Sequence, residues 1–225
     1  MTSLALYTDS SRLVALENGL NWKRFEARAA AGPLTPLPPT EGAVIVSVGR
    51  LLPLKGQAML IDAFAQVADR FPAAALWIAG DGPEAEALKA HVQARNLEGR
   101  VHLLGRRNDV PAVLAAADVF ANASSWEGMS NAVLEGMAAG LPAVVADAPG
   151  VTECHEDGVT GLVVRRDARA LADGLARLLA DADLRARMGA AARERVRTCY
   201  SMEANRQRYL DLFDKLTGRT SCAVS

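Results

Sequence analysis

Two glutamates, Glu127 and Glu135, stand eight positions apart in the segment SSWEGMSNAVLEGMAAG, residues 124–140. The spacing of apolar residues predicts a short buried strand before this segment, then a polar loop, then a helix that Gly140 and Pro142 end. Glu127 is therefore expected in the loop at the carboxyl end of a strand, and Glu135 about one turn inside the helix. An open α/β sheet binds ligands at that edge, and two carboxylates beside free helix amides suit a ligand with hydroxyl and phosphate groups.

Two basic residues, Arg50 and Lys55, follow the first expected strand and precede a helix that begins near Gly56. A diphosphate at this place would meet two cations and the positive end of a helix dipole. The alternative for these residues, and for the two glutamates, is ordinary solvation at the surface of the protein.

The composition excludes some classes of partner and site. A net charge of -1 gives no long-range attraction to nucleic acid, so no nucleic-acid partner is expected. Cys154, Cys199 and Cys222 lack metal-ligand spacing, the histidines are scattered, and we expect no metal site. We recognise no signal peptide and no apolar run long enough to span a bilayer, and free cysteines fit a reducing compartment, so a cytoplasmic location is expected.

Strands and helices alternate after a proline-rich segment at 32–42. Short apolar strands separated by amphipathic helices predict an α/β protein with a Rossmann-like, doubly wound parallel sheet. The expected strands are 44–48, 75–79, 101–104, 118–121, 143–146 and 162–164; the expected helices are 57–71, 83–95, 110–117 and 131–139, followed by two or three helices between 167 and 216 that split near 181 and 200.

Ordered motifs over residues 18–164 also resemble one known family. The segment 125–144, with its two glutamates, resembles the signature of retaining GT-B glycosyltransferases of the family-4 type, also called glycosyl transferases group 1. Other motifs that resemble this family are Asn18-Gly-Leu-Asn21 with Phe25, Val48-Gly-Arg-Leu51 with Lys55-Gly56, Ile78–Glu84, Val101–Gly105, and Gly150–Val163.

The resemblance implies a fold and a division into domains. The fold would be the C-terminal half of a GT-B fold, with trailing C-terminal helices. Residues 1–42 would be a partial interdomain segment and Pro-rich linker, 43–200 a nucleotide-sugar-binding Rossmann-like domain, and 201–225 a C-terminal helix and tail. The N-terminal acceptor domain of the family is expected to be absent. An apolar stripe on 202–216 would contact a separate acceptor domain, mediate self-association or collapse onto the domain's own surface.

The resemblance also implies an activity. The protein would be an enzyme of cell-surface polysaccharide biosynthesis that transfers a sugar from a nucleotide diphosphate-sugar to a hydroxyl acceptor, with retention of anomeric configuration. The donor is a substrate, the acceptor is a glycan, a lipid-linked sugar or a small molecule, and no cofactor is expected. The missing domain could hold the enzyme peripherally at the inner membrane. The alternative is a catalytically incomplete nucleotide-sugar-binding module, either a fragment or one half of a split enzyme.

The resemblance assigns roles to the candidate residues. Arg50 and Lys55 would bind the diphosphate, and Glu127 would lie beside the donor sugar, so these three residues are the catalytic candidates. Glu135 would accept hydrogen bonds from both ribose hydroxyls. The other expected binding residues are Gly80, Gly105 and Arg106 on the nucleotide side and Gly128, Met129, Ser130 and Asn131 on the sugar side.

Three assignments leave alternatives open. Gly80 also fits a turn that needs a glycine for purely conformational reasons. Arg106 either contacts the base or is an ordinary solvated arginine. Glu153 matches a glutamate of the family, but it either contacts the ligand or orders its own loop. Met129 stands where the family commonly has an aromatic residue, which leaves the choice of sugar open.

Overall fold

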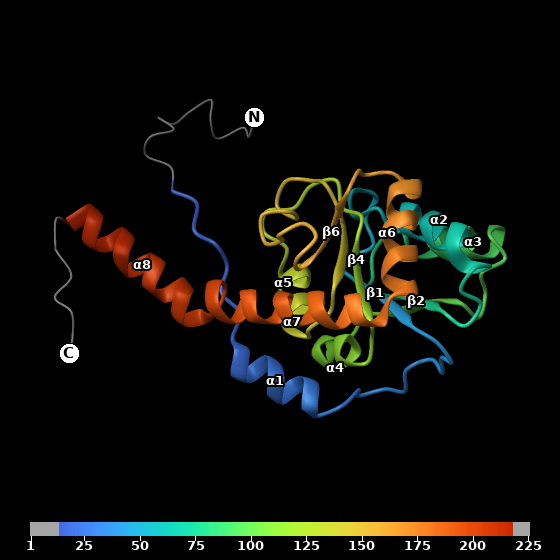
Figure 1. Cartoon of the computed structure of the whole chain (residues 1–225), viewed down its shortest axis with the longest axis horizontal. Helices are drawn as coiled ribbons and strands as arrows, with labels where there is room; N and C mark the ends of the chain where they lie inside the picture. Colours follow the sequence, from blue (N-terminus) through green and yellow to red (C-terminus); the bar gives the residue numbers. More distant parts are fainter. Residues whose placement is uncertain (1–13, 218–225) are drawn as a thin grey trace.

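The computed structural model describes residues 14–217, and its centre is a six-stranded sheet in the order β3-β2-β1-β4-β5-β6 (Figure 1). All neighbouring strands pair in parallel. This confirms the expected Rossmann-like, doubly wound sheet. The strands are β1 (Val44–Val48), β2 (Ala75–Ala79), β3 (Val101–Gly105), β4 (Val119–Asn122), β5 (Ala143–Ala146) and β6 (Gly161–Val164).

The helices follow the predicted pattern with small shifts at their ends. The helix expected over 57–71 ends at Ala68, and it cannot continue past Phe71 because the helical conformation is disfavoured for a residue before proline, here Pro72. The helical elements are α1 (Trp22–Ala30), the short 3-10 helix η3 (Pro53–Lys55), α2 (Gln57–Ala68), α3 (Ala85–Ala94), α4 (Val110–Ala115), α5 (Asn131–Ala138), α6 (Ala168–Ala180), α7 (Ala182–Cys199) and α8 (Met202–Thr217).

Alternate residues of each strand enter two separate cores, one on each face of the sheet. On β1, Ile45 packs in the core formed with α2, α3 and α6, whereas Val44 and Val46 pack in the core formed with α1, α4 and α5. Helix α7 contributes to both cores, first with Met188 and later with Val196. Apolar side chains on both faces explain why the strands are continuous apolar runs in the sequence.

Helix α1 was not predicted. It begins after Asn21, whose side chain accepts a hydrogen bond from the amide of Arg24 at 3.0 Å, and asparagine is among the best residues for this capping position. Phe25 is 5% exposed and packs in the second core. The segment assigned to an interdomain region is therefore packed, in part, against the domain.

Helix α8 continues beyond α7 and extends away from the sheet (Figure 1). Its apolar side chains Met202, Tyr209, Leu210, Phe213 and Leu216 are exposed. Over residues 14–217, none of the helices combines the length and apolar character needed to cross a membrane.

The strand order places a ligand crevice at one point of the sheet. The chain leaves β1 toward β2 on one side and later returns to β4 on the other side, so β1 and β4 are neighbours with loops that diverge. In open α/β sheets, ligands bind outside the carboxyl ends of the strands at this switch point. The loop that carries Arg50 and Lys55 follows β1, and the loop that carries Glu127 follows β4.

Candidate functional site

Lys55 and Glu127 form an ion pair at the switch point. The Nζ atom of Lys55 lies 2.6 Å from Oε2 of Glu127, and the two residues are 72 positions apart in the sequence. The side chains are only 21% and 11% exposed. Partial burial makes this attraction stronger than that of a typical surface pair, so the two loops are held together by charge.

The ion pair depends on a close approach of the two backbones. Gly56, directly after Lys55, has φ +68 and begins α2, and a Cβ atom at this position would lie 2.3 Å from the carbonyl oxygen of Ala123. The amide of Ser125 also donates to the carbonyl of Leu54 at 2.8 Å. Only glycine permits both this conformation and this distance.

The second oxygen of the Glu127 carboxylate is also bound. Ser124 Oγ donates to Oε1 of Glu127 at 2.8 Å, and Ser124 is 1% exposed. The amide of Glu127 donates to the carbonyl of Pro149 at 2.9 Å. The carboxylate is thus fixed by a lysine on one oxygen and a hydroxyl on the other, which sets its orientation before any ligand binds.

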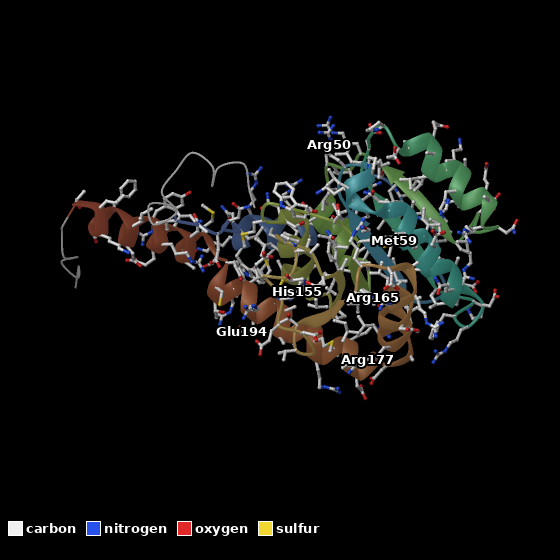
Figure 2. The ribbon with its side chains drawn as sticks, turned by 90° about the horizontal axis from the view of Figure 1, so that it is seen from above. Arg50, Met59, His155, Arg165, Arg177 and Glu194 are labelled. Carbon is white, nitrogen blue, oxygen red and sulfur yellow. The ribbon has the colours of Figure 1, made fainter. Side chains whose placement is uncertain are left out.

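Arg50 lies in a neighbouring cleft rather than in the ion pair. The cleft has a volume of 450 Å³, and its lining includes Arg50, Gly80 and Arg106. Figure 2 shows Arg50 at the rim of the domain, where its side chain is exposed. Gln57 donates from Nε2 to the backbone carbonyl of Arg50 at 2.9 Å and so holds this loop in place.

Gly80 is required at its position by a close approach. A Cβ atom there would lie 1.8 Å from the carbonyl oxygen of Gly49, so no side chain fits where the turns after β1 and β2 meet. The amide of Gly80 donates to the carbonyl of Gly105 at 2.8 Å. These glycines bring the ends of the three strands together, and a larger residue at position 80 would force their backbones apart.

Glu135 lies one turn inside α5, as predicted, and it is half-buried. Burial raises the pKa of its carboxyl, and the positive charge of Arg28 in α1 opposes this rise. Of the four charged residues assigned to one ligand, Lys55 and Glu127 are in direct contact. Arg50 lines the neighbouring cleft, and the carboxyl of Glu135 is affected by the positive charge of Arg28 in α1.

The four expected sugar-side residues, 128–131, form the start of α5 and the turn before it. Asn18 reaches this segment from the other end of the sequence: its backbone amide donates to Sδ of Met129 at 2.9 Å, and its Nδ2 donates to Oδ1 of Asn131 at 3.0 Å. Gly128 and Met129 also line a second cavity, of 410 Å³, with Asn18 and Tyr200. Ser130 is 4% exposed at the helix start.

Glu153 orders its own loop. Its Oε1 atom accepts a hydrogen bond from the amide of Gly150 at 2.9 Å, and the carbonyl of Gly150 in turn accepts from the amide of Ser130 at 3.3 Å. Of the two roles left open for this residue, the structure therefore supports the ordering of the loop that packs against Glu127 and Ser130.

The sequence analysis missed Ser124, Asn18 and Arg28 as neighbours of the site. Asn18 lies within a motif that was recognised, so its signal was present but was not linked to the sugar-side residues. Ser124 opens the segment 124–140 that was singled out, but it was not linked to Glu127, and no pattern in the sequence marks Arg28. Within residues 14–217, no group of three His, Cys, Asp or Glu side chains is arranged to hold a metal ion.

Comparisons with known proteins identify the family of the chain. Residues 35–195 match the family model described as "Glycosyl transferases group 1". Over 231 residues the chain is 34% identical to the lipopolysaccharide core biosynthesis glycosyltransferase LpsD of Rhizobium meliloti, which covers 94% of this chain and 66% of that protein. It is 36% identical over 164 residues to a GDP-mannose-dependent α-(1-6)-phosphatidylinositol monomannoside mannosyltransferase of Mycobacterium tuberculosis, covering 68% of this chain and 43% of that protein.

A solved structure of Anabaena Alr3699/HepE in complex with UDP-glucose shares the fold, with a TM-score of 0.81 and 25% identity over 94% of this chain and 60% of that chain. The chain thus spans 66% or less of the length of each of these three proteins. The family model covers most of the sequence, including the loops that carry Lys55 and Glu127. On these grounds the chain belongs to the family of glycosyl transferases group 1.

Proposed function

We propose that this chain binds a nucleotide diphosphate-sugar and supplies the donor side of a glycosyltransferase that transfers the sugar to a hydroxyl acceptor with retention of anomeric configuration. The observation that carries the proposal is the contact of Lys55 with Glu127 at the carboxyl ends of β1 and β4. A cation for phosphate and a fixed carboxylate for a sugar lie together at the place where α/β sheets bind ligands.

The diphosphate is assigned to Arg50 and Lys55. Negative charge develops on this leaving group as the bond to the sugar breaks, so cations beside it stabilise the transition state more than the ground state. Lys55 is paired with Glu127, and a diphosphate carries enough negative charge to compete for the same ammonium group.

The sugar and the ribose are assigned to the two glutamates. Glu127, held by Ser124 and Lys55, is fixed in one orientation and can accept a hydrogen bond from a sugar hydroxyl or stabilise positive charge on the ring. Glu135 accepts both ribose hydroxyls, because an ionised carboxylate has two oxygens for a vicinal diol. The amides of Gly128, Met129 and Asn131 at the start of α5 are assigned to further hydroxyl or phosphate oxygens, whereas the amide of Ser130 already donates to Gly150.

The base is assigned to the loop of Gly105 and Arg106 beside Gly80. Arginine stacks on a flat ring and also donates hydrogen bonds, which suits either a purine or a pyrimidine. The named relatives include one that depends on GDP-mannose and one bound to UDP-glucose, so both bases belong in the test.

The test is a titration of the purified chain with UDP, GDP and a panel of their sugar conjugates, followed by calorimetry. We expect one base to bind clearly better, and Glu135→Ala to weaken that binding about tenfold, which corresponds to the loss of a charge-assisted hydrogen bond. Glu203→Ala, an exposed glutamate on α8, is the matched control and should bind as the unaltered chain does. No heat with any nucleotide would reject the proposal.

A transfer assay separates the two forms of the proposal. With the nucleotide-sugar that binds best, release of the nucleoside diphosphate in the presence of an acceptor panel supports a transferase. Binding without any release supports the alternative, a nucleotide-sugar-binding module that is catalytically incomplete.

A further inference from the structure

The loop after β3 is hydrogen-bonded to the segment that follows α1. This loop, residues 106–109, contributes Arg106 and Arg107 to the lining of the 450 Å³ cleft. Loops at strand ends are usually the mobile part of an α/β domain. Here, however, two residues of the proline-rich segment, Leu34 and Thr35, are bonded directly to the loop.

The contact centres on a buried ion pair of Arg107 and Asp109, which we call the anchor. Nε of Arg107 donates to Oδ1 of Asp109 at 2.8 Å, and Nη2 donates to Oδ2 at 2.6 Å, so the pairing is bidentate. The side chains are 8% and 6% exposed. The carboxylate also accepts a bond of 2.6 Å from the amide of Leu34, and Arg107 donates to the carbonyl oxygen of Thr35 at 3.0 Å and to its hydroxyl.

Two further observations support a rigid connection. Arg28, near the end of α1, donates to the backbone carbonyl of Asn108. Burial by itself would raise the pKa of Asp109, but the hydrogen bonds from Arg107 and from the Leu34 amide outweigh this effect and lower it. The carboxylate therefore stays ionised at neutral pH, and the pair remains charged.

We propose that Arg107 and Asp109 are positioning residues for nucleotide recognition: they anchor the loop to residues 34–35 and so hold Arg106 at the edge of the cleft. The proposal rests on the proposed function, because it assumes that the cleft binds a nucleotide. Arg106 itself is adjacent to Arg107, so the anchor restrains its backbone. A loop that is ordered before binding loses less conformational entropy when the ligand arrives.

The diphosphate is assigned to other residues, namely Arg50 in the lining of the cleft and Lys55 beside Glu127. Loss of the anchor should therefore weaken recognition of the base and leave recognition of the phosphates largely intact. A residue that merely stabilised the fold would affect both ligands equally, or neither.

The test compares two ligands in calorimetry: the nucleoside diphosphate that binds best, and inorganic pyrophosphate, which lacks the base. For Asp109→Asn, which removes the charge at nearly constant volume, we expect nucleotide affinity to fall about tenfold and pyrophosphate affinity to change less than about twofold. Thermal denaturation sets a temperature at which the variant is folded for the comparison.

Two more variants complete the experiment. Asp118→Asn is the matched control. Oδ2 of Asp118 also accepts a hydrogen bond from a backbone amide, that of Val44 at 2.8 Å, but at the amino ends of the strands, away from the cleft. It should leave the ratio of the two affinities unchanged. Thr35→Val removes only the hydroxyl and serves if Asp109→Asn does not fold; we expect a fall in nucleotide affinity of about threefold.

The outcomes separate the two proposals. If the unaltered chain binds neither ligand, the proposed function fails. If it binds the nucleotide and the anchor variants bind both ligands as the unaltered chain does, or lose both equally, only the positioning role is rejected.

Discussion

Lys55 and Glu127 meet at 2.6 Å across two loops that are 72 positions apart in the sequence. Each residue therefore neutralises the other before a donor is present. Under the proposed function, a diphosphate that attracts Lys55 also changes the electrostatic surroundings of Glu127, so phosphate binding and sugar binding would be coupled through this one contact.

The first prediction concerns Lys55→Met, which removes the charge but keeps most of the apolar stem. We expect affinity for the nucleoside diphosphate to fall at least about tenfold, since a charge-assisted contact to phosphate is lost. The free energy of unfolding should fall by about 2 kcal/mol, because Glu127 is left largely buried without its cation. Calorimetry and urea denaturation measure the two effects.

The double variant Lys55→Met with Glu127→Gln distinguishes the two effects. Since the amide carries no charge, it should restore most of the lost stability and none of the lost affinity. Recovery of both together would mean that Lys55 acts only as a structural partner of Glu127.

The second prediction concerns Ser124→Ala. Its hydroxyl holds Oε1 of Glu127 at 2.8 Å, so its loss should let the carboxylate rotate. We expect affinity for the nucleotide-sugar to fall about fivefold to tenfold, and affinity for the corresponding nucleoside diphosphate, which lacks the sugar, to stay unchanged. Competition binding with both ligands is the measurement.

The neighbouring serine provides the control for this prediction. Ser125 Oγ donates to the carbonyl of Leu54 at 3.2 Å and not to the carboxylate. Ser125→Ala should therefore leave the ratio of the two affinities as it is in the unaltered chain. An equal change of that ratio in both variants would contradict a specific role for Ser124.

The sheet and the loops at its edge could be predicted because their signals are local. Continuous apolar runs marked the strands, and the return of helical spacing after residue 130 placed Glu135 inside a helix. Strand ends then implied that the loops of Lys55 and Glu127 lie at one edge. What the sequence could not predict is that these two side chains touch, because pairing depends on the distance between two backbones.

Other features had weak local signals or none. Helix α1 has a capping asparagine, Asn21, but only one buried residue, Phe25, so its stability depends on packing against the domain. The anchor of Arg107 and Asp109 reaches Leu34 and Thr35, more than 70 positions away, in a segment whose prolines indicated only a linker. Such contacts appear only when the chain is folded.

The third prediction concerns Gly56→Ala. The substitution combines a left-handed backbone, φ +68, with a Cβ atom 2.3 Å from the carbonyl oxygen of Ala123. We expect it to lower the free energy of unfolding by about 3 to 5 kcal/mol, because strain and overlap add. It should also weaken nucleotide binding, since Lys55 is the preceding residue. Urea denaturation at constant pH measures the stability.

Gly99→Ala is the control for backbone strain alone. Gly99 has φ +83, and a Cβ atom there would meet nothing within 4 Å. Its cost should be about 1 kcal/mol, the usual penalty of a left-handed conformation for alanine. Equal costs in the two variants would show that the approach to Ala123 contributes nothing.

The last prediction concerns the pH dependence of stability through His155, which is 8% exposed and lies inside the domain (Figure 2). Burial lowers its pKa to about 4, and the positive charge of Arg195 adds to this effect. In the unfolded chain the pKa is about 6.5, so between these values the unfolded state binds a proton that the folded state does not. The free energy of unfolding therefore decreases as the pH falls below about 6.5, by about 1.4 kcal/mol per pH unit.

His155→Gln isolates this contribution, because the carboxylates titrate in both proteins and cancel in the difference. The advantage of the unaltered chain over the variant should shrink by about 2 kcal/mol between pH 7.0 and pH 5.0 in urea denaturation. Its sign follows from the direction of the shift: a histidine that gained a negative partner would give the opposite slope. A constant difference over this range would mean that His155 is protonated as easily in the folded chain as in the unfolded one, which its buried position between α7 and Thr160 argues against.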